Sequence, residues 1–276
     1  MKSRCDCFFL HDEAYPKFLK EIHDPPPKLW FRGDRRALDA TCVAIVGARK
    51  ATDVGKRVAF DIAAGLAKAG VTVVSGMAFG IDAAAHLGAL DAGGFTIAVL
   101  GSGVDVPTPE RNRFLAERIE RQGLIISEFS LGTGAYASHF PQRNRIISGL
   151  SLGVVVVEAG VKSGSLITAR LALEQGRDVF AVPGEAGRVQ TAGSNGLLKQ
   201  GAIPVETAGD VIAHLDFFIP PAKGSPSLAS SATIFSLEEF AAKMGQAPRE
   251  AASMLTQLVL EGKVVEVVGH RYQLRG

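Results

Sequence analysis

The residues with the clearest chemical potential lie in the segment Ser138–Arg177, and several are of types that bind phosphate. Lys162, Ser163, Gly164 and Ser165 stand directly after a run of four valines and its following loop, at the start of a predicted helix. The first N–H groups of a helix have no partners inside it and lie at the positive end of its dipole. This turn, with its lysine, therefore suits an anion, most simply a phosphate.

A second group in the same segment combines an aromatic ring with cations. Phe140, Arg143, Asn144 and Arg145 precede the turn in the chain. A ring that stacks on a base and guanidinium groups that pair with phosphates are the usual means of gripping single-stranded nucleic acid. We expect these four residues and the turn to bind the same unpaired strand.

Short apolar runs must position these groups. The valines at 154–157 form a run too short for a helix and typical of a parallel strand covered on both faces. From Cys42 to about Leu215 similar runs alternate with amphipathic helices, which predicts an α/β fold with a doubly wound, mostly parallel sheet. Further strands are expected at 43–46, 71–75, 96–100, 124–127, 178–182 and 203–205, and the clearest helices at 54–69, 82–91 and 110–121.

Glycines and a further arginine follow the first predicted strands. Gly47 and Arg49 come after the first strand, and Gly76 comes after the second. Ligands of such sheets bind in the crevice at the carboxyl ends of the strands. We therefore expect Arg49 to point into that crevice and the glycines to let the backbone approach the ligand.

Two carboxylates at strand ends raise the question of catalysis. Glu128 and Glu158 could act on a nucleotide, or they could hydrogen-bond the N–H groups of neighbouring loops, and the second role is favoured. Asp82 and His86, four apart on a predicted helix, have a spacing compatible with a metal site or an acid/base pair. A structural role is favoured for them too, because no second ligand cluster accompanies them. No catalytic residues, metal or cofactor are expected.

Composition narrows the class of protein. The 276 residues are 47% hydrophobic and carry a net charge of +2, so any role with nucleic acid must come from local placement of cations. The three cysteines form no CxxC pair, which argues against a zinc site or a disulfide framework. Neither a signal peptide nor a transmembrane run is evident, so we expect a cytoplasmic protein without a membrane partner.

The chain divides into four predicted parts. Residues 1–40 are interpreted as a strap whose aromatic side chains pack on the following domain. Residues 41–216 form the large α/β domain, and residues 217–233, rich in Pro, Ser, Ala and Gly, are interpreted as a linker. Residues 234–276 predict two helices, at 237–244 and 248–261, followed by a hairpin at 264–274. This order resembles a winged helix, and its balanced charge favours protein interaction over duplex recognition.

Several motifs occur together and in order: VAIVGARKATDVGKR, VVSGMAFGIDAAAH, FPQRNRIISGLS and VVVVEAGVKSGSLITARLALEQGR. Over about Tyr15 to Leu215 this succession is similar to the DNA-processing protein A family, DprA, also called Smf. The resemblance implies an extended Rossmann-like domain that binds single-stranded DNA without sequence specificity, dimerises, and helps to load the RecA recombinase on incoming DNA in natural transformation. It implies no enzymatic activity.

The same resemblance assigns residues. By position in its motifs, the DNA-contacting candidates are Arg49, Phe140, Arg143, Asn144, Arg145 and Lys162 to Ser165. Residues 1–40 then represent the last portion of an amino-terminal helical domain.

For a homodimer, the resemblance directs attention to the last helix of the large domain. There Val211, Ile212 and Leu215 form an apolar stripe, which core packing explains equally well. The alternative function is a nucleotide-processing enzyme that resembles nucleoside monophosphate phosphoribohydrolases and uses Glu128 or Glu158.

Overall fold

The structure is a computed structural model that describes residues 5–215, 234–237, 240–241, 248–260, 264–267 and 271–274. The chain forms two compact units, Met1–Pro220 and Pro221–Gly276. The predicted linker at 217–233 lies outside the described residues.

A nine-stranded sheet runs through the first unit, with the strand order β1-β2-β6-β5-β4-β3-β7-β8-β9. Strands β3 to β9 are parallel to one another, whereas β2 is antiparallel to β6 and β1 is antiparallel to β2. The strands are β1 (Asp6–Phe9), β2 (Lys28–Gly33), β3 (Cys42–Val46), β4 (Thr72–Ser75), β5 (Thr96–Val99), β6 (Leu124–Ser127), β7 (Gly153–Val156), β8 (Asp178–Ala181) and β9 (Ile203–Pro204). The prediction of a doubly wound, mostly parallel sheet is confirmed.

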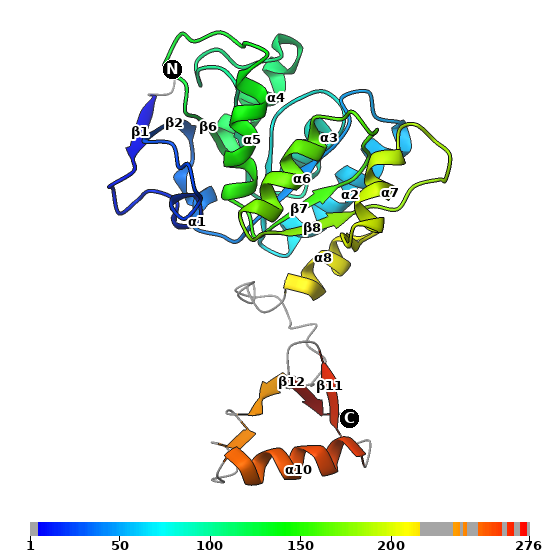
Figure 1. The fold of residues 1–276 in the computed structure, drawn as a ribbon. Coiled ribbons are helices and arrows are strands. Elements are labelled where there is room, and N and C mark those ends of the chain that lie inside the picture. The colour runs from blue at the N-terminus through cyan, green and yellow to red at the C-terminus, as the bar shows by residue number, and fades with distance from the viewer. Residues whose placement is uncertain are drawn as a thin grey trace. The chain divides into compact units, whose positions relative to one another are not determined.

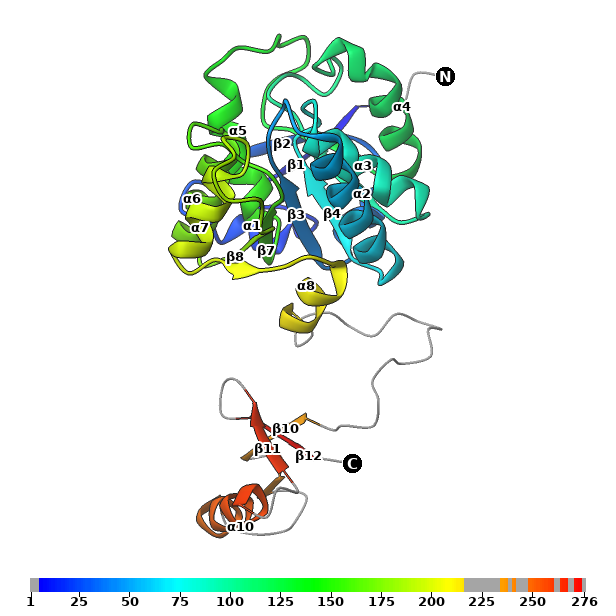
Figure 2. The same ribbon diagram turned by 90° about the vertical axis from the view of Figure 1, so that its right-hand side faces the viewer.

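Helices cover both faces of this sheet. In Figure 2, α2, α3 and α4 lie on one side of the strands, and α5, α6 and α7 lie on the other. Their bounds are α1 (Lys17–Lys20), α2 (Asp53–Lys68), α3 (Ile81–Asp91), α4 (Arg113–Gln122), α5 (His139–Gly149), α6 (Ser165–Glu174), α7 (Ala192–Lys199) and α8 (Ala208–Leu215), with short 3-10 turns at Arg35–Leu38 and Glu110–Asn112. Every residue of β3 is buried, as expected for a strand with helices on both faces.

Within the segment predicted as a strap and as the last portion of a helical domain, residues 5–40 extend the sheet by two strands, and their helical parts are the four residues of α1 and a 3-10 turn. Strand β2 pairs with β6, with Phe31 opposite Ile126, and β1 pairs with β2 (Figure 1). The rings of Phe8 and Phe31 stack with centroids 4.4 Å apart, and both side chains are buried. Two apolar strands are therefore stabilised at the edge of the large domain by pairing and burial, and the aromatic side chains pack as part of its core.

The apolar stripe predicted for a dimer surface belongs to the core of the first unit. On α8, Val211 is 0% exposed and Leu215 is 1% exposed, and both pack with α2 residues against the sheet. Ile212 is partly buried and packs on the same cluster. Core packing, the alternative that the sequence left open, accounts for the stripe, because these side chains are already covered by their own chain.

The second unit contains a three-stranded antiparallel sheet and a helix. The sheet has the order β10 (Ile234–Ser236), β12 (Arg271–Leu274), β11 (Val264–Val267), and the helix is α10 (Pro248–Leu260). Leu255 is buried, with Leu258, Val259 and Tyr272 packed around it. The second helix and the hairpin are confirmed, and Leu237, Phe240 and Ala241 are helical. The winged-helix assignment stays a prediction.

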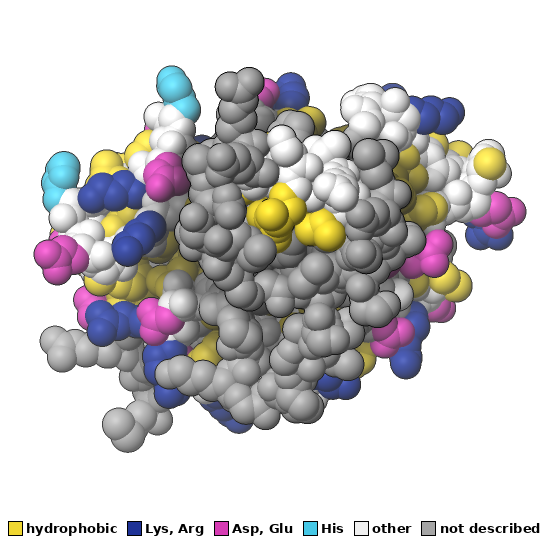
Figure 3. Space-filling view, turned by 90° about the horizontal axis from the view of Figure 1, so that it is seen from below, with side chains coloured by type: hydrophobic (Ala, Val, Ile, Leu, Met, Phe, Trp, Pro, Cys, Tyr) yellow, Lys and Arg dark blue, Asp and Glu magenta, His cyan; other side chains and the backbone are white. Residues whose placement is uncertain are grey.

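Surface charge is mixed where the described side chains can be seen. In Figure 3, Lys and Arg side chains alternate with Asp and Glu side chains around the visible face. This agrees with the net charge of +2. A binding site for an anion must therefore be sought in a local arrangement of cations.

Candidate nucleic-acid interface

The sheet has a topological switch point between β3 and β7. These parallel neighbours are in register with Val46 opposite Val156. From β3 the chain builds β4, β5 and β6 toward one edge of the sheet, and after α5 it builds β7, β8 and β9 toward the other. The loops that leave β3 and β7 therefore diverge, and the crevice between them is where folds of this type bind ligands.

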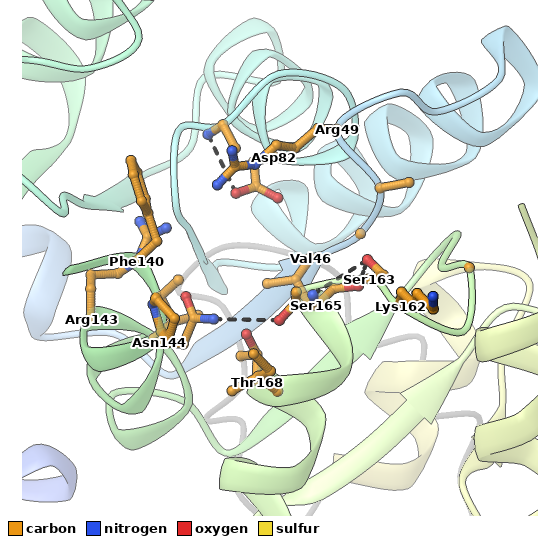
Figure 4. Close-up of a pocket in the computed structure, with 18 of the residues that line it drawn as sticks. Val46, Arg49, Asp82, Phe140, Arg143, Asn144, Lys162, Ser163, Ser165 and Thr168 are labelled. Carbon is orange, nitrogen blue, oxygen red and sulfur yellow. Dashed lines mark hydrogen bonds between the residues drawn. The ribbon is translucent and has the colours of Figure 1, made fainter. Parts of the chain in front are cut away.

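A pocket of about 800 Å³ occupies this crevice. Most of its lining comes from three places, which are the loop after β3, the helix α5, and the loop after β7 with the first turn of α6, and smaller parts come from the start of α3 and the loop after β8. Figure 4 shows Phe140 and Asn144 on one side of the pocket and Lys162 on the other, with Arg49 and Asp82 at a third side. Of the predicted site residues, those that line the pocket are Gly47, Arg49, Phe140, Arg143, Asn144, Lys162, Ser163, Gly164 and Ser165.

The wall after β3 is held close to its neighbours. The N–H of Ala48 donates to the carbonyl of Glu158 over 2.6 Å. A Cβ atom at Gly47 would lie 2.5 Å from Cγ1 of Ile81, so only glycine fits there. The exposed Arg49 follows, and its guanidinium carbon lies 5.0 Å from the centroid of the Phe140 ring. This contact is a cation–π interaction at the mouth of the pocket.

The wall after β7 is the turn that leads into α6, and the N–H groups of Ser165 and Leu166, which the sequence predicted to be free, have acceptors on Ser163. Ser163 donates its N–H to the carbonyl of Gly160 over 2.9 Å, and its hydroxyl lies 2.7 Å from that of Ser165. Space is open where Gly164 would carry a Cβ atom, so a ligand can approach the backbone there. Lys162 is exposed, and it has no ion pair within the described part of the chain. The start of α6, two hydroxyls and one unpaired ammonium group thus face the same space.

The third wall is the start of α5. Pro141 stands in its first turn, where no N–H is needed for the helix. Phe140 packs over the backbone of Gly101, where a Cβ atom would lie 3.2 Å from its ring. Asn144 directs its side-chain amide toward the carbonyl of Gly164 at 3.5 Å. The ring of Phe140 is therefore fixed beside the pocket and partly open to it.

Arg143 borders the pocket but is used inside the protein. Its side chain is 4% exposed, and it donates to the carbonyl of Gly76 over 2.9 Å and to that of Val99. Burial lowers the pKa of its guanidinium to about 10, against the raising effect of the nearby Asp82 charge. The sequence predicted a phosphate contact, whereas the structure gives this arginine the ends of β4 and β5 as partners.

Gly76 lies outside the pocket lining, beneath that arginine. A Cβ atom at Gly76 would lie 2.5 Å from both terminal nitrogens of Arg143. Its small size thus makes room for the guanidinium group that bonds to its carbonyl. Gly76 was expected to let a ligand approach the backbone, whereas in the structure it is the side chain of Arg143 that approaches the backbone there.

Arg145 points away from the pocket. Its two terminal nitrogens each lie 2.7 Å from an oxygen of Glu128, and its Nε lies 3.0 Å from the carbonyl oxygen of Asp24. The side chain is 11% exposed. Burial alone would lower the pKa of Arg145, but the hydrogen bonds and charge of Glu128 raise it above its usual value. This arginine joins α5 to β6 and to the amino-terminal segment, and the phosphate contact predicted for it is not available in this arrangement.

Both candidate catalytic carboxylates have structural partners. Glu158 is 3% exposed and accepts hydrogen bonds from the backbone N–H and the hydroxyl of Thr52, over 3.1 and 3.0 Å, so it fixes the start of α2. Glu128 binds Arg145 and also accepts from Gln142. Neither carboxylate lines the pocket. The structural role that the sequence favoured for them agrees with these contacts.

Asp82 and His86 are both buried. Oδ2 of Asp82 accepts from the N–H groups of Gly76 and Ala78, over 3.2 and 3.4 Å, and burial raises the pKa of this carboxyl group while Arg143 opposes the rise. Nδ1 of His86 lies 2.7 Å from the hydroxyl of Thr96, which itself donates to a backbone carbonyl. Nδ1 therefore carries the proton, and burial lowers the pKa of His86 to about 3.

The pair at 82 and 86 shows no sign of a metal site. Within the described residues no group of three or more His, Cys, Asp or Glu side chains is placed to hold a metal ion. The charges of Arg143 and Asp82 oppose each other within the protein. The exposed cations that line the pocket and have no ion pair among the described residues are therefore Arg49 and Lys162.

Sequence reasoning missed the apolar part of the lining. Val161 is 69% exposed and Val189 is 74% exposed, and both border the pocket. Thr168, from the first turn of α6, is buried and lies in the pocket wall. Val189 comes from the loop after β8, next to the predicted crevice, so its position after a strand end is the signal that could have identified it.

The comparisons with known proteins agree with this architecture. The family model for DNA recombination-mediator protein A matches residues 6–216. The chain belongs to this family. It is 39% identical to Protein Smf of Escherichia coli (strain K12) over 283 aligned residues, which cover 95% of this chain and 76% of the relative.

Two solved structures are also similar. DNA processing protein A from Streptococcus pneumoniae has a TM-score of 0.74 and 42% identity, with 76% of this chain and 74% of the other covered. A structure of DNA processing protein A from Helicobacter pylori, described for its single-stranded DNA binding mode, has a TM-score of 0.72 and 32% identity over 79% of this chain and 99% of the other. The extended Rossmann-like fold expected from the motifs is thus that of solved family members.

Proposed function

We propose that this recombination-mediator family member binds single-stranded DNA without sequence preference, through the pocket at the switch point. The observation that carries the proposal is that two exposed cations line the pocket from different walls, Arg49 from the loop after β3 and Lys162 from the loop after β7, and that neither has an ion pair among the described residues. Both are free to neutralise phosphates. Such contacts carry no sequence information, because the phosphate is the same in every nucleotide.

A single strand suits this pocket better than a duplex. The ring of Phe140 lies beside Arg49 at the pocket mouth and offers a face on which an unpaired base can stack. The bases of a duplex are already stacked and paired, so they would have to be unpaired before such a contact forms. The family relationship, with a member described in a single-stranded DNA binding mode, supports the same choice.

The wider role is a mediator rather than an enzyme. In this proposal the protein protects incoming DNA in the cytoplasm, acts as a homodimer and helps to load a RecA-type recombinase, as in natural transformation. None of the described helices has both the length and the apolar character needed to span a membrane. The dimer surface must lie elsewhere than on Val211 and Leu215, whose side chains are buried in their own core.

Nucleoside monophosphate hydrolysis is the less favoured function. A carboxylate acting on the ribosyl bond must reach the ligand, but Glu128 is paired with Arg145 and Glu158 is bound to Thr52. Incubation with nucleoside monophosphates, followed by chromatography for released base, gives the direct check. We expect no release above that of a heat-inactivated sample.

The binding proposal is tested by fluorescence anisotropy of labelled oligonucleotides. Oligothymidine and a mixed-sequence single strand of equal length are compared with the matching duplex, for the wild type and for Lys162→Ala. We expect similar affinities for the two single strands, weaker binding of the duplex, and about a tenfold loss in the variant, from one lost charge-assisted contact. A folded wild type that binds no single strand at low salt would refute the proposal.

A further inference from the structure

An ordered group of aromatic rings lies next to the pocket, in and after the loop that follows β6. The rings of Phe129 and His139 stack with centroids 3.9 Å apart and planes 13° apart. The ring of Tyr136 meets that of His139 edge-on, with centroids 5.0 Å apart. We call these three residues the aromatic shelf. Tyr136 is 62% exposed, whereas Phe129 and His139 are half-buried, so the shelf presents one ring to solvent.

The shelf is fixed to the same backbone as the pocket wall. Nδ1 of His139 lies 3.0 Å from the carbonyl oxygen of Gly101, and Phe140 packs on Gly101 from the pocket side. Ala137, the residue after Tyr136, lines the pocket. The exposed ring of Tyr136 and the pocket ring of Phe140 are thus supported by neighbouring contacts on one glycine.

The loop that carries the shelf is held by hydrogen bonds. The N–H of Gly103 donates to the carbonyl of Thr133 over 2.9 Å, and the N–H of Gly132 donates to both carboxylate oxygens of Asp105, over 2.9 and 3.0 Å. These contacts tie the loop after β6 to the loop after β5. The position of Tyr136 is therefore set before any ligand arrives, which lowers the entropic cost of using its ring.

Another exposed aromatic residue provides a contrast. Phe114 on α4 is 70% exposed, yet among the described residues it takes part in no ring–ring or cation–ring contact, and it does not line the pocket. Tyr136 buries little apolar surface, so the core gains little from it, but its position is held by the edge-on contact with the His139 ring and by the N–H of His139, which donates to the carbonyl of Tyr136 over 3.0 Å. An exposed, positioned tyrosine beside an anion-binding pocket is the arrangement of a stacking platform.

We propose that Tyr136 is a second base-stacking position, which takes the base of a nucleotide just outside the pocket while the pocket holds its neighbour. This inference rests on the proposed binding of single-stranded DNA and adds to it the path of the strand across the loop after β6. Every base has a stacking face, so the shelf retains the lack of sequence preference. The ligand class is an unpaired strand long enough to extend beyond the pocket.

The first test varies the length of the strand. Oligothymidines from the dinucleotide to roughly 12 nucleotides, within the range of single-strand site sizes, compete with a labelled strand for the wild type, Tyr136→Ala, Tyr136→Phe and Phe114→Ala. For Tyr136→Ala we expect a loss on the order of tenfold for the long strands and none for the dinucleotide. Tyr136→Phe should retain most of the affinity, and the matched control Phe114→Ala should bind like the wild type.

A second test removes the base instead of the ring. One abasic residue is placed at each position in turn of the shortest strand on which Tyr136→Ala shows its full effect, because a strand of this length cannot shift its register, and the effect of Tyr136→Ala is measured on each. If Tyr136 stacks on a base, an abasic residue at one position should lower the affinity of the wild type. On that strand, Tyr136→Ala should cause no further loss of affinity. A loss in Tyr136→Ala that is equal for all lengths and all abasic positions would refute the inference, because it would indicate general damage to the pocket.

The two proposals fail in different ways. If the wild type binds no single strand, the proposed function itself fails. If the wild type binds and Lys162→Ala weakens binding, but Tyr136→Ala equals the wild type at every length, only the stacking position fails. Thermal unfolding of each variant establishes that the comparison concerns folded protein, and the high exposure of Tyr136 predicts little change in stability.

Discussion

Two pairs of cations near the switch point have opposite roles. Arg49 and Lys162 are exposed at the pocket, on the walls that follow β3 and β7, and have no ion pair within the described chain. Arg143 and Arg145 are two residues apart on α5, yet the guanidinium group of each is hydrogen-bonded to acceptors within the protein. A guanidinium group is available to a ligand only where its N–H groups do not already donate to acceptors within the protein.

The largest effect is expected from removing the buried arginine. Arg143→Ala leaves the carbonyls of Gly76 and Val99 without their donor and Asp82 without its compensating charge. We expect the free energy of unfolding to fall by about 3 kcal/mol. Urea denaturation measures this, with Arg113→Ala, an exposed arginine on α4, as the matched control. Equal stability of the two variants would contradict the structural role.

The buried His86 makes the stability of the protein depend on pH. The folded state keeps His86 neutral until its pKa of about 3, whereas the unfolded state protonates it near 6.5. Between these values the unfolded state binds more protons, so stability is lost as the pH falls through this range. From about pH 7 to about pH 5 this histidine alone should cost about 2 kcal/mol. The raised pKa of Asp82 acts in the opposite direction, because its folded form takes up a proton at higher pH than the unfolded form.

The contribution of His86 to this pH dependence is measured by substitution. Unfolding free energies of the wild type and His86→Gln, which retains a side-chain donor for Thr96, are compared across the same pH range. The variant should lose less stability on acidification than the wild type. Parallel pH profiles would mean that His86 does not contribute.

A smaller effect on stability, and none on binding, is expected from Arg145. Arg145→Ala removes the two contacts to Glu128 and leaves that carboxylate, of which 10% is exposed, without its cation. We expect a loss of about 1 kcal/mol, recovered in part when Glu128→Gln is added. A double-mutant cycle of unfolding free energies measures the coupling. Additive effects would indicate that the pair is not coupled.

The smallest effect is expected on the affinity for single-stranded DNA when Arg49 is replaced by another cation. Arg49→Lys keeps the positive charge but removes the planar group that lies over Phe140. We expect an affinity loss of roughly threefold, a fraction of a kcal/mol, with an unchanged salt dependence. Anisotropy titrations at two salt concentrations test this. A shallower salt slope for this variant would mean that the lysine fails to reach the phosphate.

The sequence was a good guide to the parallel strands and a poor guide to the arginines. Strands such as β3 are buried on both faces and therefore appear as continuous apolar runs, whereas β1 and β2 form an antiparallel edge whose pattern is short and mixed. The turn at Lys162 could be predicted because its lysine, serines and glycine are consecutive in the sequence. The partners of Arg143 and Arg145 are 67 and 17 residues away in the chain, so only the fold determines which cation remains free.

A salt series distinguishes the pocket cations from the buried arginines as the groups that bind DNA. The affinity for labelled oligothymidine is measured against salt concentration for the wild type, the Arg49→Ala/Lys162→Ala double variant and Arg145→Ala. Each lost phosphate contact should lower the log–log slope by about 0.7. We predict a slope shallower by about 1.4 for the double variant and an unchanged slope for Arg145→Ala. A shallower slope for Arg145→Ala, with an unchanged one for the double variant, would contradict the assignment of the pocket as the DNA site.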